Sequence, residues 1–477
     1  MTTTDDTPPN SPALPPEPKA LRKRVVGLAW PIISENLLET MLGIVDTAMV
    51  AALGSAAIAG VGTGQQMMFF VLAALAALSI GNSVLVAQAV GAKSLDRAGH
   101  LARQSLIWSL FFSIPLALTG VLLSHYLVKG FGVAEDVSSI ATGYFEVTMA
   151  TAVVLVALVI GSGVLRGAGD SRTPMVVTLI ANILNVILAY GLIYGHFGLP
   201  NLGPVGSAWA TFVARAVALA LLLRVLWQGR NGVSISGAGG GWRPEWSVAK
   251  QVLKLGVPAA MEQMLIASAF VFLTGVVAHL GTDTLAAQRI SMSALSFSFM
   301  PGFGFSIAAT TLVGQSIGAK KPLDAAAVAK TAATWAVIWM GSIGLVIMAL
   351  AEPIMHRFTS DPEVIRIGAA GLRIVALTQP AWAIGMVHSG ALRGSGDTRF
   401  PMIISASGVW TAVLLAALLT RVTNWGLPAV WCAFLCTSPV TATLSCRRFY
   451  SRIKSMADAQ GETSAAPASA PEPLAAH

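Results

Sequence analysis

Long apolar stretches separated by short polar breaks fill the sequence from Leu28 to Tyr450. A helix needs about 20 residues to cross a hydrocarbon core of about 30 Å, and twelve stretches reach that length. We predict membrane-spanning helices at residues 28–52, 60–90, 100–128, 138–165, 174–196, 204–227, 250–280, 284–317, 325–351, 364–391, 400–420 and 427–446. The predicted fold is therefore an all-α integral membrane protein.

The composition supports this interpretation. The 477-residue chain is 55% hydrophobic and only 11% charged, whereas a soluble globular domain carries about 25% charged residues. So few charges cannot coat soluble domains, which excludes an ordinary soluble enzyme. The three cysteines lie close together near the C-terminal end and supply neither a disulfide framework nor a zinc ligand set. We expect no cofactor.

The basic residues form short clusters between the apolar stretches, which argues against a nucleic-acid partner despite the net charge of +8. If the N-terminus is cytoplasmic, 23 of the 30 Lys and Arg residues fall in predicted cytoplasmic segments and six in outer segments. Only Arg215 falls inside the membrane. Because positive residues favour cytoplasmic loops, we predict a multi-pass plasma-membrane protein with both termini cytoplasmic. We expect a monomer.

The chain contains an internal repeat. Val164–Met175 (VLRGAGDSRTPM) and Ala391–Met402 (ALRGSGDTRFPM) are identical at eight of twelve positions, at a separation of 227 residues. The same separation aligns Val86–Lys93 with Val313–Lys320. A constant offset in distant segments indicates a duplication of six helices. Since six is an even number, both halves enter the membrane in the same direction, related by an axis along the membrane normal.

The repeat also pairs Pro31 with Pro258 and Glu35 with Glu262. It divides the chain into two halves joined by a glycine-rich segment that favours a flexible linker. The predicted organisation is a disordered cytoplasmic tail (1–23), an N-lobe (24–228), a cytoplasmic linker (229–247), a C-lobe (248–450) and a cytoplasmic C-terminal tail (451–477).

These segments together resemble the multidrug and toxic compound extrusion (MATE) family. The resemblance rests on Trp30–Gly54 (WPIISENLLETMLGIVDTAMVAALG), on the duplicated segments and on Asn185–Thr211, and it covers about residues 24–450. It is closest to bacterial members with an acidic coupling residue in the first helix, which implies the bacterial inner membrane. It also implies two six-helix lobes in a V around a central cavity, and export of organic compounds against an inward flow of protons or sodium ions.

The resemblance assigns roles to particular residues. It implies that Asp46 is the acid tied to cation coupling, that Pro31 allows the first helix to bend, and that Asn185 faces the acid. Ala189 stands where some members carry a second acid, and Ile266 stands where sodium-coupled relatives carry an acid in the second lobe. These departures favour proton coupling, with sodium coupling as the alternative.

Asp46 is also the leading candidate on physical grounds. Burying a carboxylate in lipid costs several kcal/mol, so intramembrane acids usually serve ion pathways. Removal from water favours the protonated form, and we predict that Asp46 loads a proton from outside. Asn182 and Asn185 share a helix face and could hold the carboxylate or a water, and structural helix pairing explains them about equally well. The alternative is that Asp46 only hydrogen-bonds a neighbouring helix.

Glu35 and Glu262 are second-rank coupling candidates. Each follows a proline by four residues. A structural salt bridge or a capping role near the cytoplasmic mouth is an equally good interpretation of both. We predict that the Arg and Asp of each LRGxGD segment pair with each other as a structural latch.

Methionine, aromatic and polar residues suggest a cavity for flat amphipathic cations, because thioethers and rings adapt to varied ligands. The candidate cavity residues are Gln65, Met68, Tyr190, Thr211, Met292 and Phe299. Helix packing or lipid contact is the commoner explanation for any single one of them.

We therefore predict a secondary antiporter, not an enzyme, that exports amphipathic organic cations in exchange for protons. No stretch fits the phosphate-binding pattern GxxxxGK[ST], so the chain carries no motif for ATP-driven pumping. The alternatives are a sodium-coupled exporter and a flippase for lipid-linked precursors. A flippase for anionic lipids would need several basic residues facing the cavity, and only Arg215 is placed for that. The expected partners are small organic molecules and the lipid bilayer.

Overall fold

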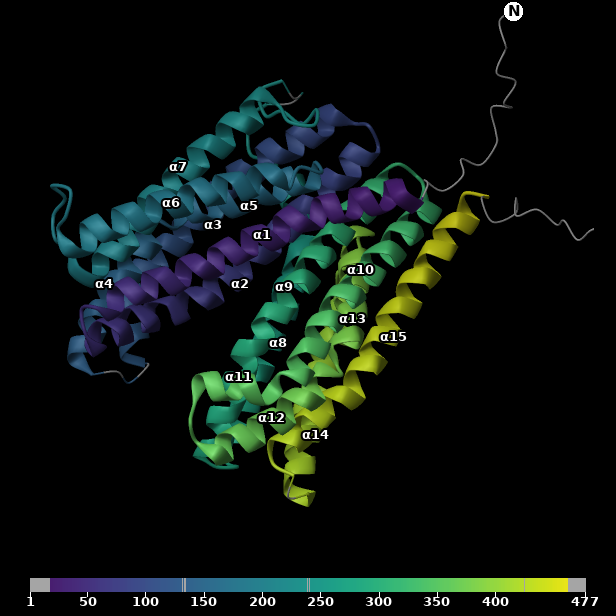
Figure 1. Cartoon of the computed structure of the whole chain (residues 1–477). Coiled ribbons are helices and arrows are strands. Elements are labelled where there is room, and N and C mark those ends of the chain that lie inside the picture. The colour runs from purple at the N-terminus through teal and green to yellow at the C-terminus, as the bar shows by residue number, and fades with distance from the viewer. Residues whose placement is uncertain are drawn as a thin grey trace, which may run out of the picture.

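A computed structural model describes residues 18–130, 132, 134–237, 239, 241–423 and 425–461; within α2 the side chains of 69, 70, 72–74 and 76–78 are also outside the described part. The helices are α1 (Pro18–Ala51), α2 (Ser55–Gly91), α3 (Leu95–Gly130), α4 (Glu135–Ala150), α5 (Ala152–Gly167), α6 (Arg172–Tyr194), the 3₁₀ helix η1 (Gly203–Val205), α7 (Gly206–Gln228), α8 (Trp246–Ala278), α9 (Thr282–Gly318), α10 (Pro322–Ala349), α11 (Ala351–Phe358), α12 (Pro362–Ala376), α13 (Gln379–Gly394), α14 (Arg399–Val422) and α15 (Leu427–Ala459) (Figure 1). The described chain is all-helical, as predicted.

The helices account for the predicted membrane spans. Nine described helices are long and apolar enough to cross a membrane, and two bent pairs raise this number to eleven. The 37-residue α2 is the repeat counterpart of α9, and α9 is one of the nine membrane-spanning helices. We therefore count α2 as the twelfth span. The spans predicted at 138–165 and 364–391 are each formed by two helices, because α4 and α5 meet at 56° and α12 and α13 at 49°.

Repeat-related threonines lie at both breaks. The Thr151 hydroxyl donates to the Val147 carbonyl oxygen at 2.8 Å, and the Thr378 hydroxyl donates to the Val375 carbonyl oxygen at 2.6 Å. Such back-bonding offers the carbonyl a second partner and bends helices. In the second half Pro380 also lacks the N–H that a continuous helix would need.

Both ends of the helical region extend beyond the predicted boundaries. α1 begins at Pro18 and α15 continues to Ala459, so residues 18–23 and 451–459, assigned to the tails, are helical. The rest of the predicted tails, 1–17 and 462–477, lies outside the described residues.

The linker is fastened to α3. Gln104 Nε2 donates to the Arg243 carbonyl oxygen at 2.7 Å, and the Glu245 backbone N–H donates to Gln104 Oε1 at 2.9 Å. Arg103 Nε donates to the Ile235 carbonyl oxygen at 3.0 Å. The glycine-rich composition favoured a flexible connection, but these bonds to buried α3 side chains hold the described linker residues in place.

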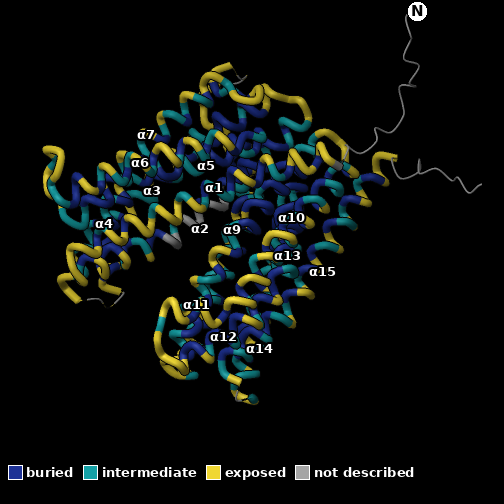
Figure 2. Tube along the Cα trace, viewed as in Figure 1, coloured by how far each residue is buried: buried dark blue, intermediate teal, exposed yellow. Residues whose placement is uncertain are grey.

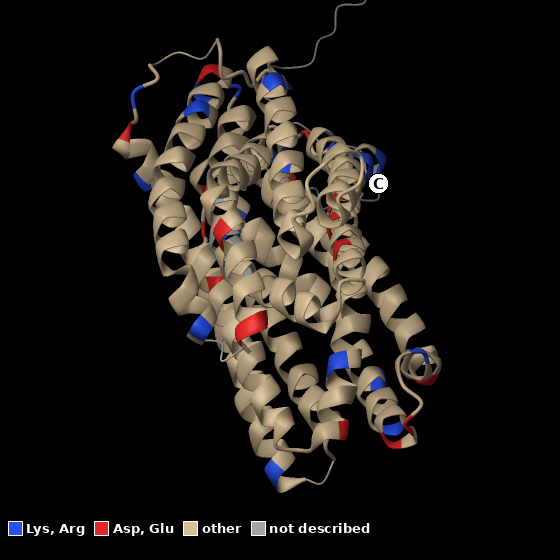
Figure 3. Ribbon diagram, turned by 90° about the vertical axis from the view of Figure 1, so that its left-hand side faces the viewer, with Lys and Arg blue, Asp and Glu red and all other residues tan. Residues whose placement is uncertain are grey.

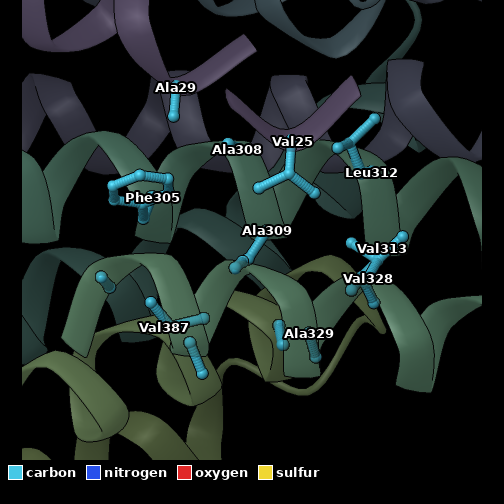
Figure 4. Packing of buried hydrophobic residues seen from close by; sticks show 14 of the residues in the cluster. Val25, Ala29, Phe305, Ala308, Ala309, Leu312, Val313, Val328, Ala329 and Val387 are labelled. Atoms are coloured by element: carbon cyan, nitrogen blue, oxygen red, sulfur yellow. The ribbon is translucent and has the colours of Figure 1, made fainter. Parts of the chain in front are cut away.

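The helices form two lobes, α1–α7 and α8–α15. Figure 1 shows the lobes together at the end that carries the start of α1 and the end of α15, and splayed apart at the other end. The first helix of each lobe crosses to the opposite lobe at the joined end. Val25 and Ala29 of α1 pack among Phe305 and Ala308 of α9 (Figure 4). In the same way Val248 and Val252 of α8 pack into an apolar cluster of the first lobe.

Hydrogen bonds between α2 or α9 and the opposite lobe repeat the same symmetry. Gln88 Nε2 donates to the Gly394 carbonyl oxygen at 3.0 Å, and Gln315 Nε2 donates to the Gly167 carbonyl oxygen at 3.1 Å. Gln88 and Gln315 are 227 residues apart, as are Gly167 and Gly394. We call the end of the molecule defined by these two bonds the closed end.

The crossing of α2 and α9 at the closed end depends on Gly91 and Gly318. A Cβ atom on Gly91 would overlap the backbone oxygen of Gln315, and one on Gly318 would overlap that of Gln88. Backbone atoms cannot turn aside as a flexible side chain can. Only glycine therefore permits the two helices to approach this closely.

We expect Gly91→Ala to destabilise the folded protein by about 1–3 kcal/mol, since overpacking forces the backbone apart. The melting temperature of the purified protein in detergent measures this. The control is Gly275→Ala in α8, where an added Cβ meets nothing within 4 Å and should be neutral or stabilising by up to about 1 kcal/mol. Equal melting temperatures for the two variants would contradict the close crossing.

The outer surface fits a lipid environment. Figure 2 shows exposed residues along the outer helices, and many are large and apolar: Leu122 is 72% exposed, Leu414 67% and Val271 62%. Exposed apolar area on this scale marks a surface that is covered by another phase or protein. Charged residues gather mostly toward the helix ends (Figure 3). The chain is therefore an integral membrane protein.

Candidate functional site

Asp46 lies inside the first lobe, where α1 packs against α6 and near α7. It is only 5% exposed. Its Oδ2 accepts a hydrogen bond from the Ser207 hydroxyl at 2.7 Å, and Ser207 is fully buried. Within the described part of the chain Asp46 Oδ1 has no hydrogen-bond donor. The buried carboxylate therefore has one satisfied oxygen and one that is open to a proton.

One face of α7 supplies the groups around this acid. Ser207, Thr211 and Arg215 are spaced by four residues and so lie on one side of the helix. Thr211 Oγ1 accepts a hydrogen bond from Asn185 Nδ2 at 3.0 Å. Arg215 lies close enough to Asp46 and Glu39 to interact with both electrostatically. A guanidinium group thus helps to balance the acidic charge in the lobe.

The two asparagines of α6 each bond to a neighbouring helix. Asn182 Nδ2 donates to the Leu38 carbonyl oxygen at 2.8 Å, which ties α6 to α1. Asn185 donates to Thr211, and its Oδ1 is buried without a donor in the described part of the chain. Asn182 pairs α6 with α1 and Asn185 pairs α6 with α7, which is the structural alternative, and neither amide donates a hydrogen bond to Asp46. Ser207, one helix further along the chain, makes that bond.

Two tyrosines, Tyr194 and Tyr144, lie close to this site. Tyr194 donates its hydroxyl to the Met49 carbonyl oxygen at 2.6 Å, close to the C-terminal end of α1. Tyr144 of α4 is buried and near enough to Asp46 and Arg215 to interact electrostatically with both. Gly64 leaves room for the Tyr144 ring, because a Cβ there would lie 2.6 Å from its Cδ1.

The second lobe has no counterpart of this polar site. The 227-residue offset places Leu273 at the position of Asp46 and Ala412 at the position of Asn185. Leu273 and Ala412 are both fully buried members of one apolar cluster. The duplicated architecture therefore carries a buried acid at this repeat position in one half only.

Pro31 lies within α1, which runs unbroken from Pro18 to Ala51. Because proline lacks a backbone N–H, the Gly27 carbonyl oxygen loses its normal partner one turn earlier. This weakens the helix locally without breaking it here. Bending at Pro31 remains a prediction.

The glutamates near the prolines form ion pairs. Arg166 Nη2 lies 2.7 Å from Glu35 Oε1 and donates a hydrogen bond to it. Arg393 Nη1 lies 3.5 Å from Glu262 Oε2. Both carboxylates are buried. These contacts support the salt-bridge interpretation. Glu35 and Glu262 each have a positively charged partner.

The predicted pairing within each LRGxGD segment is wrong. Arg166 and Arg393, at the ends of α5 and α13, turn toward α1 and α8 instead. Asp170 pairs with Arg230 Nε at 2.9 Å, and Asp397 lies 3.3 Å from an Arg448 nitrogen. Each segment is still a latch, but it joins elements distant in the sequence.

The six predicted cavity residues fall into three groups. Met68 is 5% exposed within the packed core of the first lobe, as the helix-packing alternative expects. Met292 and Phe299 pack partly buried against the second-lobe core. Thr211 and Gln65 are half-buried in the first lobe, and Tyr190 is exposed beside Tyr194 and His196. For all six a role in substrate binding stays a prediction.

Sequence reasoning missed Ser207 as the partner of Asp46. The available signal was the spacing of Ser207, Thr211 and Arg215, which marks a polar face on an otherwise apolar helix. Among the described residues no group of three or more His, Cys, Asp or Glu side chains could hold a metal ion.

The matches to a known protein family coincide with the two halves of the internal repeat. The MatE family profile matches residues 31–191 and 258–418, two segments separated by the same 227 positions. The chain is 34% identical over 439 residues to the "Probable multidrug resistance protein NorM" of Thermotoga maritima, covering 90% of this chain and 92% of the relative. It is 24% identical over 428 residues to the "Uncharacterized transporter YisQ" of Bacillus subtilis, covering 89% and 93%.

Solved structures show the same fold. The structure described as "Crystal structure of MATE in the bent conformation" superposes with a TM-score of 0.85 at 23% identity, covering 93% of this chain and 99% of that one. The structure described as "Crystal structure of MATE in the straight conformation" gives a TM-score of 0.84 at 23% identity, covering 92% and 97%. These likenesses support the two-lobe, twelve-span architecture predicted from the sequence.

Proposed function

Because this chain belongs to the MatE family of membrane transporters, we propose that it is a multidrug efflux transporter that exports amphipathic organic cations in exchange for protons, with Asp46 as the coupling acid. The observation that carries this proposal is the buried Asp46 carboxylate: among the described residues its Oδ1 has no hydrogen-bond partner, and the corresponding position in the second lobe is Leu273. An intramembrane acid is expensive to bury and typically serves an ion pathway.

The chemistry around Asp46 suits a proton. A proton on Oδ1 would turn this unpaired oxygen into a hydrogen-bond donor, and the buried Asn185 Oδ1 on the adjacent helix lacks a donor. Protonation would also cancel the negative charge that attracts a cationic substrate. Proton and substrate then favour opposite states of the same lobe, and this antagonism is what allows one gradient to drive the other flow.

The orientation of the chain is part of the proposal. The basic clusters near the closed end favour a cytoplasmic location for it, because Lys and Arg are retained on that side. The splayed end would then face outward in the bacterial inner membrane. A proton entering from outside would reach Asp46 from the splayed side of the first lobe.

The test is transport by purified protein in proteoliposomes. A fluorescent lipophilic cation serves as the substrate, and a pH gradient or a sodium gradient is imposed separately. One proton exchanged per monovalent cation across two pH units supports about a hundredfold concentration ratio, since each unit is worth a factor of ten. We expect cation movement under the pH gradient and none above the background under the sodium gradient.

The same assay evaluates the sodium-coupled alternative. Transport driven only by sodium would overturn proton coupling while leaving the efflux function intact. A chain that moves the dye without either gradient and without saturation would contradict an exchange mechanism altogether.

A further inference from the structure

A basic cavity lies at the closed end of the second lobe, away from Asp46. It has a volume of about 390 Å³. Its lining includes Lys254 of α8, Arg399 at the start of α14, and Arg448 and Arg452 of α15. Asp397 is the one acidic residue in the lining.

The positive charge of this cavity is not balanced by the protein. Arg448 Nη2 lies 3.3 Å from Asp397 Oδ2, and Arg452 Nη1 lies 3.9 Å from the same oxygen. Lys254 and Arg399 are exposed. Among the described residues neither of these two forms an ion pair or a side-chain hydrogen bond. Four cations therefore face one carboxylate.

The first lobe builds the same turn with fewer basic residues. Asp170, the repeat counterpart of Asp397, accepts hydrogen bonds from the Thr173 backbone N–H at 3.1 Å, the Thr173 hydroxyl at 2.5 Å and Arg230 Nε at 2.9 Å. Arg172 stands at the position that corresponds to Arg399, and Gly27 at the position that corresponds to Lys254. The turn of the first lobe thus has two arginines, Arg172 and Arg230, beside Asp170, whereas the second lobe adds Lys254 and a second α15 arginine, and these extra cations need another explanation.

The cavity lies at the level where lipid phosphates are expected. Arg399 is the first residue of α14, a 24-residue helix that qualifies as a membrane span. The first turn of α14 adds positive dipole charge here, while the Phe400 N–H already donates to Asp397 Oδ1 at 3.2 Å. Arg448 also lies 5.2 Å above the ring of Phe400, which holds its guanidinium at the rim.

We propose that this basic cavity binds a phosphate group, carried by the headgroup of an anionic lipid or present as free phosphate. Basic pockets between membrane helices at the membrane surface bind anionic lipid headgroups. Arginine matches the geometry of phosphate through charge-assisted hydrogen bonds. This site is separate from the acid of the first lobe and does not depend on the coupling ion.

Native mass spectrometry of the purified full-length protein tests the proposal. The protein is titrated with phosphatidylglycerol and, separately, with phosphatidylcholine of the same acyl chains. Wild type is expected to prefer the anionic lipid. The Lys254→Gln/Arg399→Gln variant should bind it about 30-fold more weakly, because each basic residue near the surface contributes about fivefold.

Two controls separate this site from general charge and from misfolding. Lys254→Arg/Arg399→Lys keeps both charges and should bind like wild type. Arg366→Gln/Arg373→Gln removes two charges from exposed ion pairs with Glu363 and Glu352, and it should also retain the preference. The melting temperature of each variant without lipid confirms that it is folded.

Inorganic phosphate distinguishes the two sources. If it displaces phosphatidylglycerol, or stabilises wild type but not the Lys254→Gln/Arg399→Gln variant, free phosphate occupies the cavity. If it does neither while the lipid preference holds, the lipid headgroup is the ligand. The proposal is overturned if that variant keeps the wild-type preference. It is also overturned if wild type binds both lipids equally and phosphate stabilises every variant alike.

Discussion

The Asp46→Asn variant is expected to lose proton-driven efflux completely. Asparagine has nearly the same shape as aspartate and can still accept the hydrogen bond from Ser207, but it cannot bind or release a proton. A gradient of two pH units should then sustain a substrate ratio near unity instead of about a hundredfold. The measurement is fluorescent-cation transport in proteoliposomes under an imposed pH gradient.

A second readout separates lost coupling from lost folding. Exchange of labelled for unlabelled substrate across the membrane, without any gradient, needs binding and conformational change but no net proton movement. We expect Asp46→Asn to retain this exchange at a higher substrate concentration, because the variant lacks the carboxylate charge that attracts the cation. Glu262→Gln is the matched carboxylate-to-amide change in the second lobe, and it should keep proton-driven efflux. Full efflux by Asp46→Asn would refute the coupling role of this acid.

Replacing Arg166 by methionine should produce the largest loss of stability. Glu35 is only 3% exposed, and the substitution would leave its charge buried without its hydrogen-bonded partner. Breaking one side of a buried ion pair typically costs about 3–5 kcal/mol. The melting temperature of the purified protein in detergent, followed by size-exclusion chromatography, measures this loss.

Related variants identify the cause of that loss. Glu35→Gln/Arg166→Met removes both charges and should recover much of the stability, since apolar replacement of a whole buried pair is often neutral. Arg373→Met breaks an exposed pair with Glu352 and should cost no more than about 1 kcal/mol. Arg393→Met should have a smaller effect than Arg166→Met, because its pair with Glu262 is longer. Equal losses in all single variants would contradict this account.

Much of the fold was predictable because lipid imposes a simple rule on sequence. Every span must be apolar for about 20 residues, so the stretch at 174–196 is visible directly and is observed as α6, Arg172–Tyr194. The breaks at Thr151 and Thr378 were not predictable in this way. A hydroxyl that bends a helix leaves the hydropathy of the stretch unchanged.

The site was predictable only in part, for a related reason. Asp46 is conspicuous because a carboxylate is costly in lipid, whereas a serine such as Ser207 costs little and appears at many apolar positions. Arg166 was assigned to Asp170 because the two are near in sequence. The direction in which a side chain leaves the end of a helix depends on which neighbouring helix packs there, and only the tertiary structure supplies that information.

Pro31 and Pro258 each divide a helix that packs partly on one lobe and partly on the other. The part of α1 before Pro31 packs on the second lobe, while the part that carries Asp46 packs within the first lobe. Pro258 divides α8 in the same manner. Any rotation of one lobe relative to the other must therefore be absorbed within α1 and α8, close to the residue where each lacks a backbone hydrogen bond. We therefore expect each proline to act as a hinge, so that motion between the lobes is transmitted along α1 to Asp46.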